Sequence, residues 1–291
     1  MNTDGLKTFI MLSKLKNFTR TAERMFVAQS TVTNRISELE KETGKRLFVR
    51  KRDGVELTQE GCVFLNYAVR ITELEEAFIQ EVNSAAKYKK SLKIGAINAV
   101  YESSLYPVIS EFIKSHKDYS TKVVLGHSLD MLQMLQDKII DIGFSYVPLK
   151  KTGFSCEQFL SDRLALFVSP RINGFREGIR KAELAKLDYL LCNFAYGDVG
   201  VFIMSLFPPR HVFGFEIDNS GKLIRYLIDG LGYSFLPCRL VENEVKEGLL
   251  EEVRLIDFAT PAIVTYCSYA NHNASALEFL KTPNFRNSFN F

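Results

Sequence analysis

Apolar side chains recur at helical spacing along the N-terminal part of the chain. Leu6 and Phe9 lie on one face of a first helix, which we expect to end at Asn17. Thr19 has the side chain of an N-cap and is expected to begin a short second helix that runs to Met25. The pattern therefore predicts two helices in quick succession before the tripeptide FVA.

Residues 28–44 form the third helix of this pattern. Val32, Ile36 and Leu39 make an apolar stripe, whereas the opposite side carries small polar side chains such as Ser30. Two helices joined by a tight turn, the second with a polar outer face, are typical of a helix-turn-helix. A polar face opposite an apolar stripe is also what an ordinary surface helix shows, so this helix taken alone leaves both interpretations open.

A hairpin signal follows the third helix. In the segment RLFVRKRDGVELT, two runs with alternating apolar residues flank RDG, which predicts two strands joined by a tight turn. A basic hairpin next to a helix-turn-helix is a wing that can lie along a phosphate backbone. We assign residues 1–58 to a winged helix-turn-helix domain. The basic residues that crowd the hairpin are Arg46, Arg50, Lys51 and Arg52.

Residues 59–88 carry a heptad seam that no proline interrupts. Such a seam favours a linker helix that pairs with a second copy of the chain. A helix packed on its own domain is the alternative. The seam positions, at alternating spacings of four and three, are Phe64, Ala68, Ile71, Glu75, Phe78, Val82 and Ala85.

The pattern changes at Leu92. Short apolar runs alternate with helical patterns, as in LKIGAI, SSLYPVISEFIKSH and TKVVLG, and this βαβαβ series predicts a parallel, doubly wound sheet. A second series follows, and the chain then returns to a strand and a helix. We predict two lobes, one of residues 92–162 completed by 263–291 and one of 163–262, with a cleft at the carboxyl ends of the strands.

Composition limits the possible classes of protein. The 291 residues are 46% apolar and 24% charged, as in an ordinary globular protein. No apolar run approaches the roughly 18 residues that span a bilayer, and polar residues break the apolar runs at the N-terminus, so we expect neither a membrane span nor a signal peptide. The five cysteines form no C-x-x-C pair, and the four histidines lack metal-ligand spacing. We therefore expect reduced thiols in a cytoplasmic protein without a metal or other cofactor.

Positive charge is concentrated near the N-terminus. Residues 1–60 hold 12 Lys and Arg against 8 Asp and Glu, whereas the remaining 231 residues hold 25 against 26. A basic N-terminal module on a near-neutral body is typical of a protein with a polyanionic partner.

At this point the sequence resembles the LysR-type transcriptional regulators over its whole length. The segment FTRTAERMFVAQSTVTNRISELEKETGKRLFVRKRDGVELTQEG follows the family pattern of Phe-Thr, Ala-Glu-Arg, Gln-Ser, Leu-Phe-x-Arg and Leu-Thr at fixed spacing. The C-terminal part matches more loosely, chiefly in LIDGLGYSFLP. The resemblance implies an α/β protein with an N-terminal winged helix-turn-helix, a linker helix and a two-lobed effector domain like a periplasmic binding protein. It also implies a non-enzymatic regulator that assembles as a dimer or tetramer on double-stranded promoter DNA, responds to a small-molecule effector and has RNA polymerase as a candidate partner.

The resemblance implies that the polar side of residues 28–44 enters a major groove, N-terminal end first. Gln and Asn side chains can pair bidentately with adenine, whereas arginines on phosphates position the protein without reading sequence. For each arginine, a solvated surface charge is the alternative. The residues expected at base edges are Gln29, Ser30, Thr33 and Asn34, those expected on phosphates are Arg35, Arg50 and Arg52, and Thr19 and Thr31 complete the predicted DNA-binding set.

Two departures from the family pattern concern this helix. Ala28 stands where the family usually has Ser, so one side-chain cap is expected to be missing. Asn34 stands where the family often has Arg, with Arg35 beside it. The base preference of the helix is therefore less transferable than its placement.

Three loops that follow strands and precede helices are expected to aim helix N-termini at the cleft: 98–104, 193–198 and 218–221. Ser104 has the side chain of an N-cap, and the resemblance places its loop at the family's effector contact. Glu102 either neutralises a helix dipole or points inward, where it would favour a cation-bearing or amphipathic ligand over a small anion. The predicted effector-binding residues are Asn98, Val100, Tyr101, Ser103, Ser104, Ser128, Ser145, Asn193, Tyr196 and Asn219.

Two other classes of protein compete with a regulator. The α/β body alone would suit a solute-binding protein, but the missing signal peptide and the basic N-terminal module oppose this. An α/β enzyme is the other alternative, yet G-x-S-x-G, G-x-G-x-x-G, P-loop and H-E-x-x-H motifs are all absent from the sequence.

Overall fold

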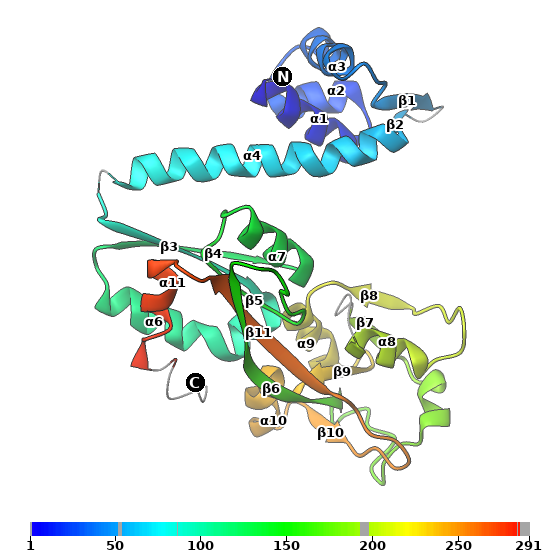
Figure 1. Cartoon of the computed structure of the whole chain (residues 1–291). Coiled ribbons are helices and arrows are strands. Elements are labelled where there is room, and N and C mark those ends of the chain that lie inside the picture. Colours follow the sequence, from blue (N-terminus) through cyan, green and yellow to red (C-terminus); the bar gives the residue numbers. More distant parts are fainter. Residues whose placement is uncertain (1, 52–53, 86, 193–197, 284, 286–291) are drawn as a thin grey trace. The chain divides into compact units, whose positions relative to one another are not determined.

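The computed structural model describes residues 2–51, 54–85, 87–192, 198–283 and 285 (Figure 1). The chain divides into two compact units, Met1–Lys87 and Tyr88–Phe291. Within the described ranges, no helix is long and apolar enough to cross a membrane.

The first unit consists of helices and one short hairpin. The hairpin pairs residues Phe48 to Lys51 with Leu57 to Gly54 in antiparallel register, which confirms the predicted hairpin. The elements in chain order are α1 (Thr3–Leu15), α2 (Phe18–Met25), α3 (Gln29–Thr43), β1 (Phe48–Lys51), β2 (Gly54–Leu57) and α4 (Gln59–Ala85).

Asparagine side chains cap the starts of α1 and α2. Asn17, not Thr19, is the N-cap of α2, because its side chain accepts a hydrogen bond from the backbone N–H of Arg20 at 3.0 Å. The prediction that Thr19 caps α2 is therefore wrong, and Thr19 is an exposed residue of the first turn. Ala28 begins α3 without a side-chain cap, as predicted, and Gly44 ends it at φ 65°.

The apolar stripe of α3 packs into the core of the first unit. Val32, Ile36 and Leu39 are buried, which confirms their predicted side of the helix. Phe9 of α1 is at the centre of this core, with ring centroids 5.0 Å from Phe48 and 4.9 Å from Phe64. The core therefore joins α1, α3, the hairpin and the first turns of α4.

The seam of α4 has two different environments. Phe64 and Ala68 pack into the core of the first unit, so this end of the helix belongs to its own domain. Farther along, Ile71, Phe78 and Val82 are 38%, 67% and 56% exposed. The alternative of a helix packed on its own domain thus holds at the start of the seam, whereas apolar side chains are exposed beyond it.

One large mixed sheet runs through the second unit. β3 pairs in parallel with β4 and with β5, as the βαβαβ pattern predicts. The sheet order is β10-β6-β11-β5-β3-β4, and β9 also pairs with β6. The strands are β3 (Lys90–Ile97), β4 (Tyr119–Gly126), β5 (Ile142–Ser145), β6 (Phe154–Val168), β9 (Tyr233–Pro237), β10 (Glu251–Val253) and β11 (Ala262–Ala270).

Beyond the parallel pairs of β3 with β4 and β5, the strands of this sheet pair antiparallel. β6 and β11 pair antiparallel with each other, and β6 also pairs antiparallel with β9 and β10. β11 lies between β5 and β6 and pairs antiparallel with both. β6 is 15 residues long, and its first part pairs with β11 whereas its last part pairs with β9.

Helices cover both faces of the sheet where β3, β4 and β5 lie (Figure 1). α6 and α11 pack on one face and α7 on the other. α5, the π-helical turn η1 and α6 follow one another without a break. These helices are α5 (Asn98–Val100), η1 (Tyr101–Leu105), α6 (Tyr106–Ser115), α7 (Ser128–Gln136) and α11 (Ala274–Phe279).

The region around residues 169–250 has its own small sheet and helices. β7 pairs in parallel with β8. The elements are η2 (Lys181–Lys186), β7 (Leu190–Cys192), α8 (Asp198–Ser205), β8 (Phe215–Ile217), α9 (Ser220–Ile228), η3 (Cys238–Val241) and α10 (Glu242–Lys246).

The hydrophobic clusters of the second unit are distributed over two regions. One cluster combines residues between 92 and 160 with others between 267 and 285, and two clusters lie mostly between residues 164 and 263. The lobe boundaries at 162 and 263 stay a prediction, which this separation supports. Tyr146 is partly buried against all three clusters, so it stands where the two regions meet.

Candidate functional sites

The first turns of α3 present an exposed polar surface. Gln29, Ser30, Thr33 and Asn34 are all exposed, on the side opposite the buried stripe. The Thr33 hydroxyl donates to the carbonyl of Gln29 at 3.1 Å, which leaves its lone pairs available to a further donor. Thr31 is half-buried. Because Ala28 provides no side-chain cap, the N–H groups at this helix start keep their capacity to bind an external acceptor.

Arg35 is held within the first unit. Its guanidinium donates to the Asp4 carboxylate at 2.7 Å and to the Thr8 hydroxyl at 3.2 Å. These bonds tie α3 to the start of α1, so a phosphate contact by Arg35 would have to share the guanidinium with them. The phosphate contact of Arg35 stays a prediction.

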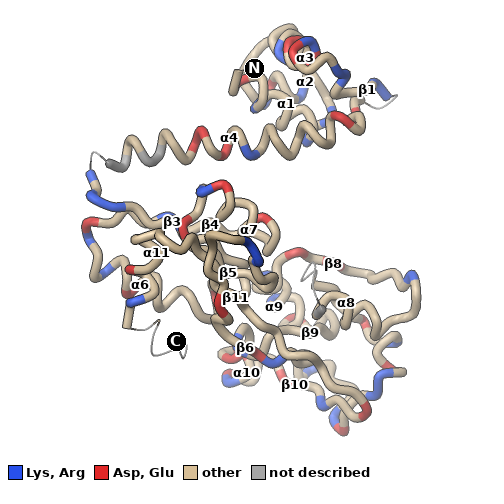
Figure 2. Tube along the Cα trace, viewed as in Figure 1, with Lys and Arg blue, Asp and Glu red and all other residues tan. Residues whose placement is uncertain are grey.

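The hairpin exposes a basic edge beside α3. Arg46 and Arg50 are exposed, and Lys51 is 3.9 Å from the Glu56 carboxylate in a loose ion pair. Figure 2 shows basic positions along β1 and both signs of charge along α3. Arg52 lies outside the described residues.

The turn before α3 has a feature that the sequence pattern did not indicate. Phe26 ends α2 in the left-handed conformation, with φ 55°, and its side chain is 94% exposed. A residue with a Cβ atom is strained in this conformation. Asn and Gly are the usual signals for a left-handed C-cap, and a Phe gives none.

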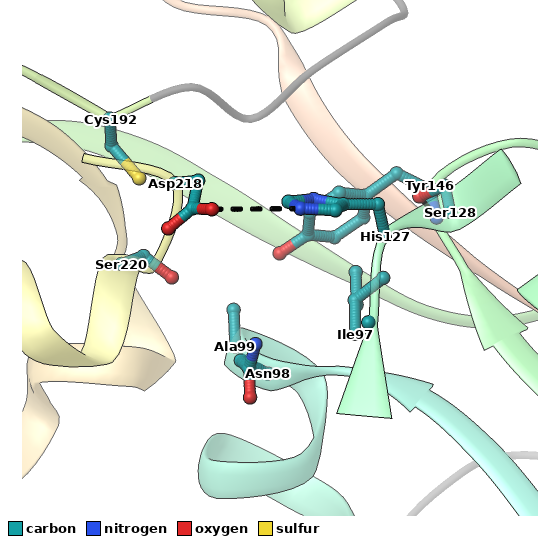
Figure 3. A pocket seen from close by; sticks show the side chains of 10 residues that line it. Ile97, Asn98, Ala99, His127, Ser128, Tyr146, Cys192, Asp218 and Ser220 are labelled. Atoms are coloured by element: carbon teal, nitrogen blue, oxygen red, sulfur yellow. Dashed lines mark hydrogen bonds and ion pairs between the residues drawn. The ribbon is translucent and has the colours of Figure 1, made fainter. Parts of the chain in front are cut away.

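The second unit has a cleft at the carboxyl ends of five strands. Its walls come directly after β3, β4, β5, β7 and β8, the position at which open α/β sheets bind ligands. Figure 3 shows side chains from these separate segments around one space. The lining residues are Ile97, Asn98, Ala99, Gly126, His127, Ser128, Tyr146, Cys192, Asp218 and Ser220.

Three helices begin at this cleft. α5 begins at Asn98, α7 at Ser128 and α9 at Ser220, and each of these residues lines the cleft. α5 and α7 have no side-chain cap, so external acceptors can bind their first N–H groups. The positive ends of three helix dipoles make this region favourable for a negatively charged or polar group.

Polar side chains bridge the two sides of the cleft. His127 Nε2, before α7, lies 3.9 Å from Asp218 Oδ2, before α9 (Figure 3). Ser128 accepts a hydrogen bond from the backbone N–H of Tyr146 at 3.1 Å. Burial, followed by the proximity of Cys192 and Asp162, raises the pKa of the Tyr146 phenol, which therefore stays a neutral hydrogen-bond donor.

Cys192 is not a reactive thiol. Burial, and to a smaller extent Asp218, raises the pKa of its thiol to about 12. The thiolate is the nucleophilic form of cysteine, so a protonated thiol at this position acts as a small apolar wall of the cleft.

The structure places several predicted effector residues away from the cleft lining. Val100 is buried in the hydrophobic core, and the Ser145 hydroxyl, also buried, donates to the Val147 carbonyl at 2.7 Å. Tyr101, Ser103 and Ser104 belong to the π-helical turn η1, which does not line the cleft.

The capping role expected of Ser104 is wrong. Helical structure already begins at Asn98, six residues earlier, and Ser104 is a buried residue inside η1 whose hydroxyl lies 3.1 Å from that of Ser103. Asn219 caps α9 by accepting from the N–H of Lys222 at 3.0 Å. Its side chain is therefore engaged within its own helix.

Two predicted residues line the cleft and two others cannot be placed. Asn98 and Ser128 are part of the lining. Asn193 and Tyr196 lie outside the described residues. His127, Asp218 and Ser220 were not among the predicted residues, although the loop 218–221 was expected at the cleft and His127 also comes directly after a strand. That position is the sequence signal that could have found them.

Glu102 does not line the cleft. Its carboxylate stands against Gly221, because a Cβ atom added to Gly221 would lie within 2.2 Å of Glu102 Oε2. It therefore reaches the first turn of α9, where a negative charge complements the helix dipole. Partial burial, with a contribution from Glu244, raises the pKa of this carboxyl.

Comparison with known proteins identifies both units. Residues 3–62 match the bacterial regulatory helix-turn-helix protein, lysR family, and residues 85–281 match the LysR substrate binding domain. The chain belongs to the LysR family. It is a sequence-specific DNA-binding transcriptional regulator with an effector-binding domain, which decides against a solute-binding protein and an enzyme.

Relatives and solved structures match this LysR regulator along most of its length. It is 26% identical over 285 residues to the HTH-type transcriptional regulator CitR of Bacillus subtilis, covering 96% of this chain and 97% of CitR. It is 31% identical over 261 residues to an uncharacterized HTH-type transcriptional regulator of Methanocaldococcus jannaschii, covering 86% and 87%.

The crystal structure of CbnR, a LysR family transcriptional regulator, has a TM-score of 0.67 to this chain at 20% identity, covering 99% of each. Full-length CbnR complexed with its target DNA gives a TM-score of 0.66, covering 99% of this chain and 100% of CbnR. These likenesses confirm the fold class predicted from the sequence.

Proposed function

We propose that the exposed start of α3 reads base edges in a major groove. Gln29 and Asn34 offer amide groups that can pair bidentately with adenine, and Ser30 and Thr33 offer hydroxyls that suit several bases. The observation that supports this assignment is their shared exposure on one helix face beside an uncapped helix start.

The phosphate contacts are proposed for the groups that flank this helix. Arg50 and Arg52 on the hairpin would hold one stretch of backbone, and Thr19 in the first turn of α2 would hold another. Thr31 and Arg35, both less exposed, would act at the edge of the same interface. A regulator that reads chromosomal DNA in this way acts in the cytoplasm.

The exposed apolar stripe of α4 is proposed to contact the same stripe of a second copy of the chain. Val63, Tyr67 and Leu74 are 56%, 58% and 43% exposed, alongside Ile71, Phe78 and Val82. Spacings of three and four place them along one side of the helix, as in a two-helix seam. Pairing would bury this apolar surface and present two copies of α3 to the two halves of a palindrome.

The cleft at the three helix starts is proposed to bind a small-molecule effector. Its position at the carboxyl ends of five strands carries this proposal. A ligand that binds the cleft differently in two arrangements of the regulator would shift their populations, and DNA would then change ligand affinity by the same factor. A molecule with no preference between the arrangements would change nothing.

A blocked cleft tests the effector proposal. Asn98→Trp would fill the cleft from a partly exposed position, whereas Glu247→Trp adds the same side chain at an exposed site after α10. Thermal stabilisation of the wild type by a panel of amino acids, carboxylates and sugars should vanish in Asn98→Trp and persist in Glu247→Trp. Equal ligand responses in both variants would place the effector site elsewhere.

A further inference from the structure

The charges that line the cleft restrict what can bind there. Among the described lining residues, Asp218 is the acidic side chain and His127 the basic one, and neither Lys nor Arg is present. A ligand whose only charge is negative would approach the Asp218 carboxylate without an arginine or lysine to offset it. An anion-only effector is therefore poorly matched to this lining.

A preference for a negatively charged group exists a short distance from Asp218. Ser220 is 6% exposed, lines the cleft and makes no side-chain hydrogen bond to any residue that the structure describes. Its hydroxyl therefore keeps donor and acceptor capacity that a ligand in the cleft can use. Together with the uncapped starts of α5 and α7, it offers donors to a carboxylate.

The carboxylate that favours a positive group and the hydroxyl that favours a negative group lie in one loop. Asp218 and Ser220 are two residues apart, before and at the start of α9, so their Cα atoms lie within about 7.6 Å of each other. A ligand that uses both must carry its positive and negative groups close together. An α-amino acid does so, because its ammonium and carboxylate groups are attached to the same carbon.

From these observations, we infer that the effector is a small zwitterion of the α-amino-acid class. This inference rests on the proposed function of the cleft. The ligand carboxylate binds the helix starts and the Ser220 hydroxyl, and the ligand ammonium binds Asp218. In the free protein, His127 faces Asp218 at 3.9 Å, beyond hydrogen-bond distance, so the ammonium takes the place of a loose contact.

The contact between Asp218 and a ligand would also join the two regions of the second unit. His127 and Ser128 belong to the loop after β4, whereas Asp218 and Ser220 belong to the loop after β8. The carboxylate of a compact zwitterion would contact the helix starts after β3 and β4 as well as Ser220, while its ammonium contacts Asp218. Its binding therefore favours the arrangement in which the two loops are close.

The test uses ligand analogues on the unaltered full-length protein. The twenty common L-α-amino acids are screened by thermal shift, together with dicarboxylates and neutral sugars, and the best binder is measured by calorimetry. Its N-acetyl derivative removes the positive charge and its amide removes the carboxylate. We expect the amide to bind about ten- to a hundredfold more weakly than the parent, the effect of losing a hydrogen-bonded charge. We expect the N-acetyl derivative to bind up to about fivefold more weakly, because the Asp218 side chain is 75% exposed and an ion pair with it is screened.

Single-residue variants show which side chain of the protein binds each end of the ligand. Asp218→Asn should weaken the amino acid by a similar factor and leave the N-acetyl derivative unchanged, whereas Ser220→Ala should weaken both compounds. Glu216→Gln removes one negative charge from the same loop region, on β8, at an exposed site outside the cleft lining. This control should bind the amino acid as the wild type does.

The outcomes separate this inference from the proposed function. If a dicarboxylate or sugar binds the wild type and no amino acid does, the zwitterion inference is overturned while the effector cleft stands. Equal affinity for the amino acid and its N-acetyl derivative overturns it as well. If no compound of any class stabilises the wild type, both the cleft and its ligand class are contradicted.

Discussion

The DNA-reading face and the effector cleft differ in how much of the chain each requires. Gln29, Ser30, Thr33 and Asn34 lie within two turns of α3, so one helix and its buried stripe suffice to position them. The cleft takes its lining from five segments between Ile97 and Ser220, and each follows a different strand. The local site depends on one packed helix face, whereas the dispersed site depends on strands of two sheets in the second unit.

This difference predicts that the two functions can be separated physically. Removing residues 1–87 should abolish DNA binding and leave residues 88–291 folded with unchanged ligand affinity, because the second unit holds its own hydrophobic clusters. Gel shifts and calorimetry on the truncated chain measure both properties. Specific DNA binding by residues 88–291 would show that the reading face is not confined to the first unit.

Substitutions that remove a buried ring from one of the two units should each shift a separate unfolding transition. Phe9→Ala removes a fully buried ring from the first unit, and Phe235→Ala does so in the second. Each should destabilise its own unit by about 3–5 kcal/mol and leave the other transition in place. Differential scanning calorimetry distinguishes this from a single shared transition, which would contradict the independence of the units.

Two asparagine helix caps, one in each unit, test the same separation of the units with a smaller expected effect. Asn17 and Asn219 each accept a backbone N–H at 3.0 Å, in α2 and α9 respectively. Replacing either by Ala should cost about 1 kcal/mol in its own unit. Asn219→Ala should also weaken ligand binding, since α9 begins at the cleft, whereas Asn17→Ala should leave ligand affinity unaltered. Calorimetric titration of both variants checks this contrast.

The smallest expected effect concerns the strained turn before α3. Phe26→Gly relieves the left-handed strain of about 1–2 kcal/mol but loses up to about 1 kcal/mol through glycine's greater freedom when unfolded. We expect a net gain of about 0.5 kcal/mol in the first unit. Phe26→Ala keeps the strain and should show no such gain in chemical denaturation, so equal stability of the two variants would argue against strain at this turn.

The same contrast explains what the sequence could predict. The stripe of Val32, Ile36 and Leu39 and the RDG hairpin depend on neighbouring residues, and both were confirmed. The α2 cap was misplaced by two positions because Asn17 and Thr19 are both capping residues. Their choice depends on where the backbone turns, which spacing alone does not fix.

The cleft was less predictable because its geometry depends on distant segments. Asn98 was found from strand–loop–helix order, but helical structure there begins earlier than the capping signal of Ser104 suggested. The approach of Asp218 to His127 needs residues 91 positions apart to meet across the cleft. No periodicity in the sequence encodes that meeting.

The central claim is that α3 reads bases while the hairpin only positions the regulator. Selection from a random-sequence duplex pool by the full-length wild type, Asn34→Ala and Arg50→Ala tests it most directly. We expect Asn34→Ala to enrich a different consensus, and Arg50→Ala to enrich the wild-type consensus with weaker binding and a salt slope reduced by about one. An unchanged consensus for Asn34→Ala together with an altered one for Arg50→Ala would contradict the account.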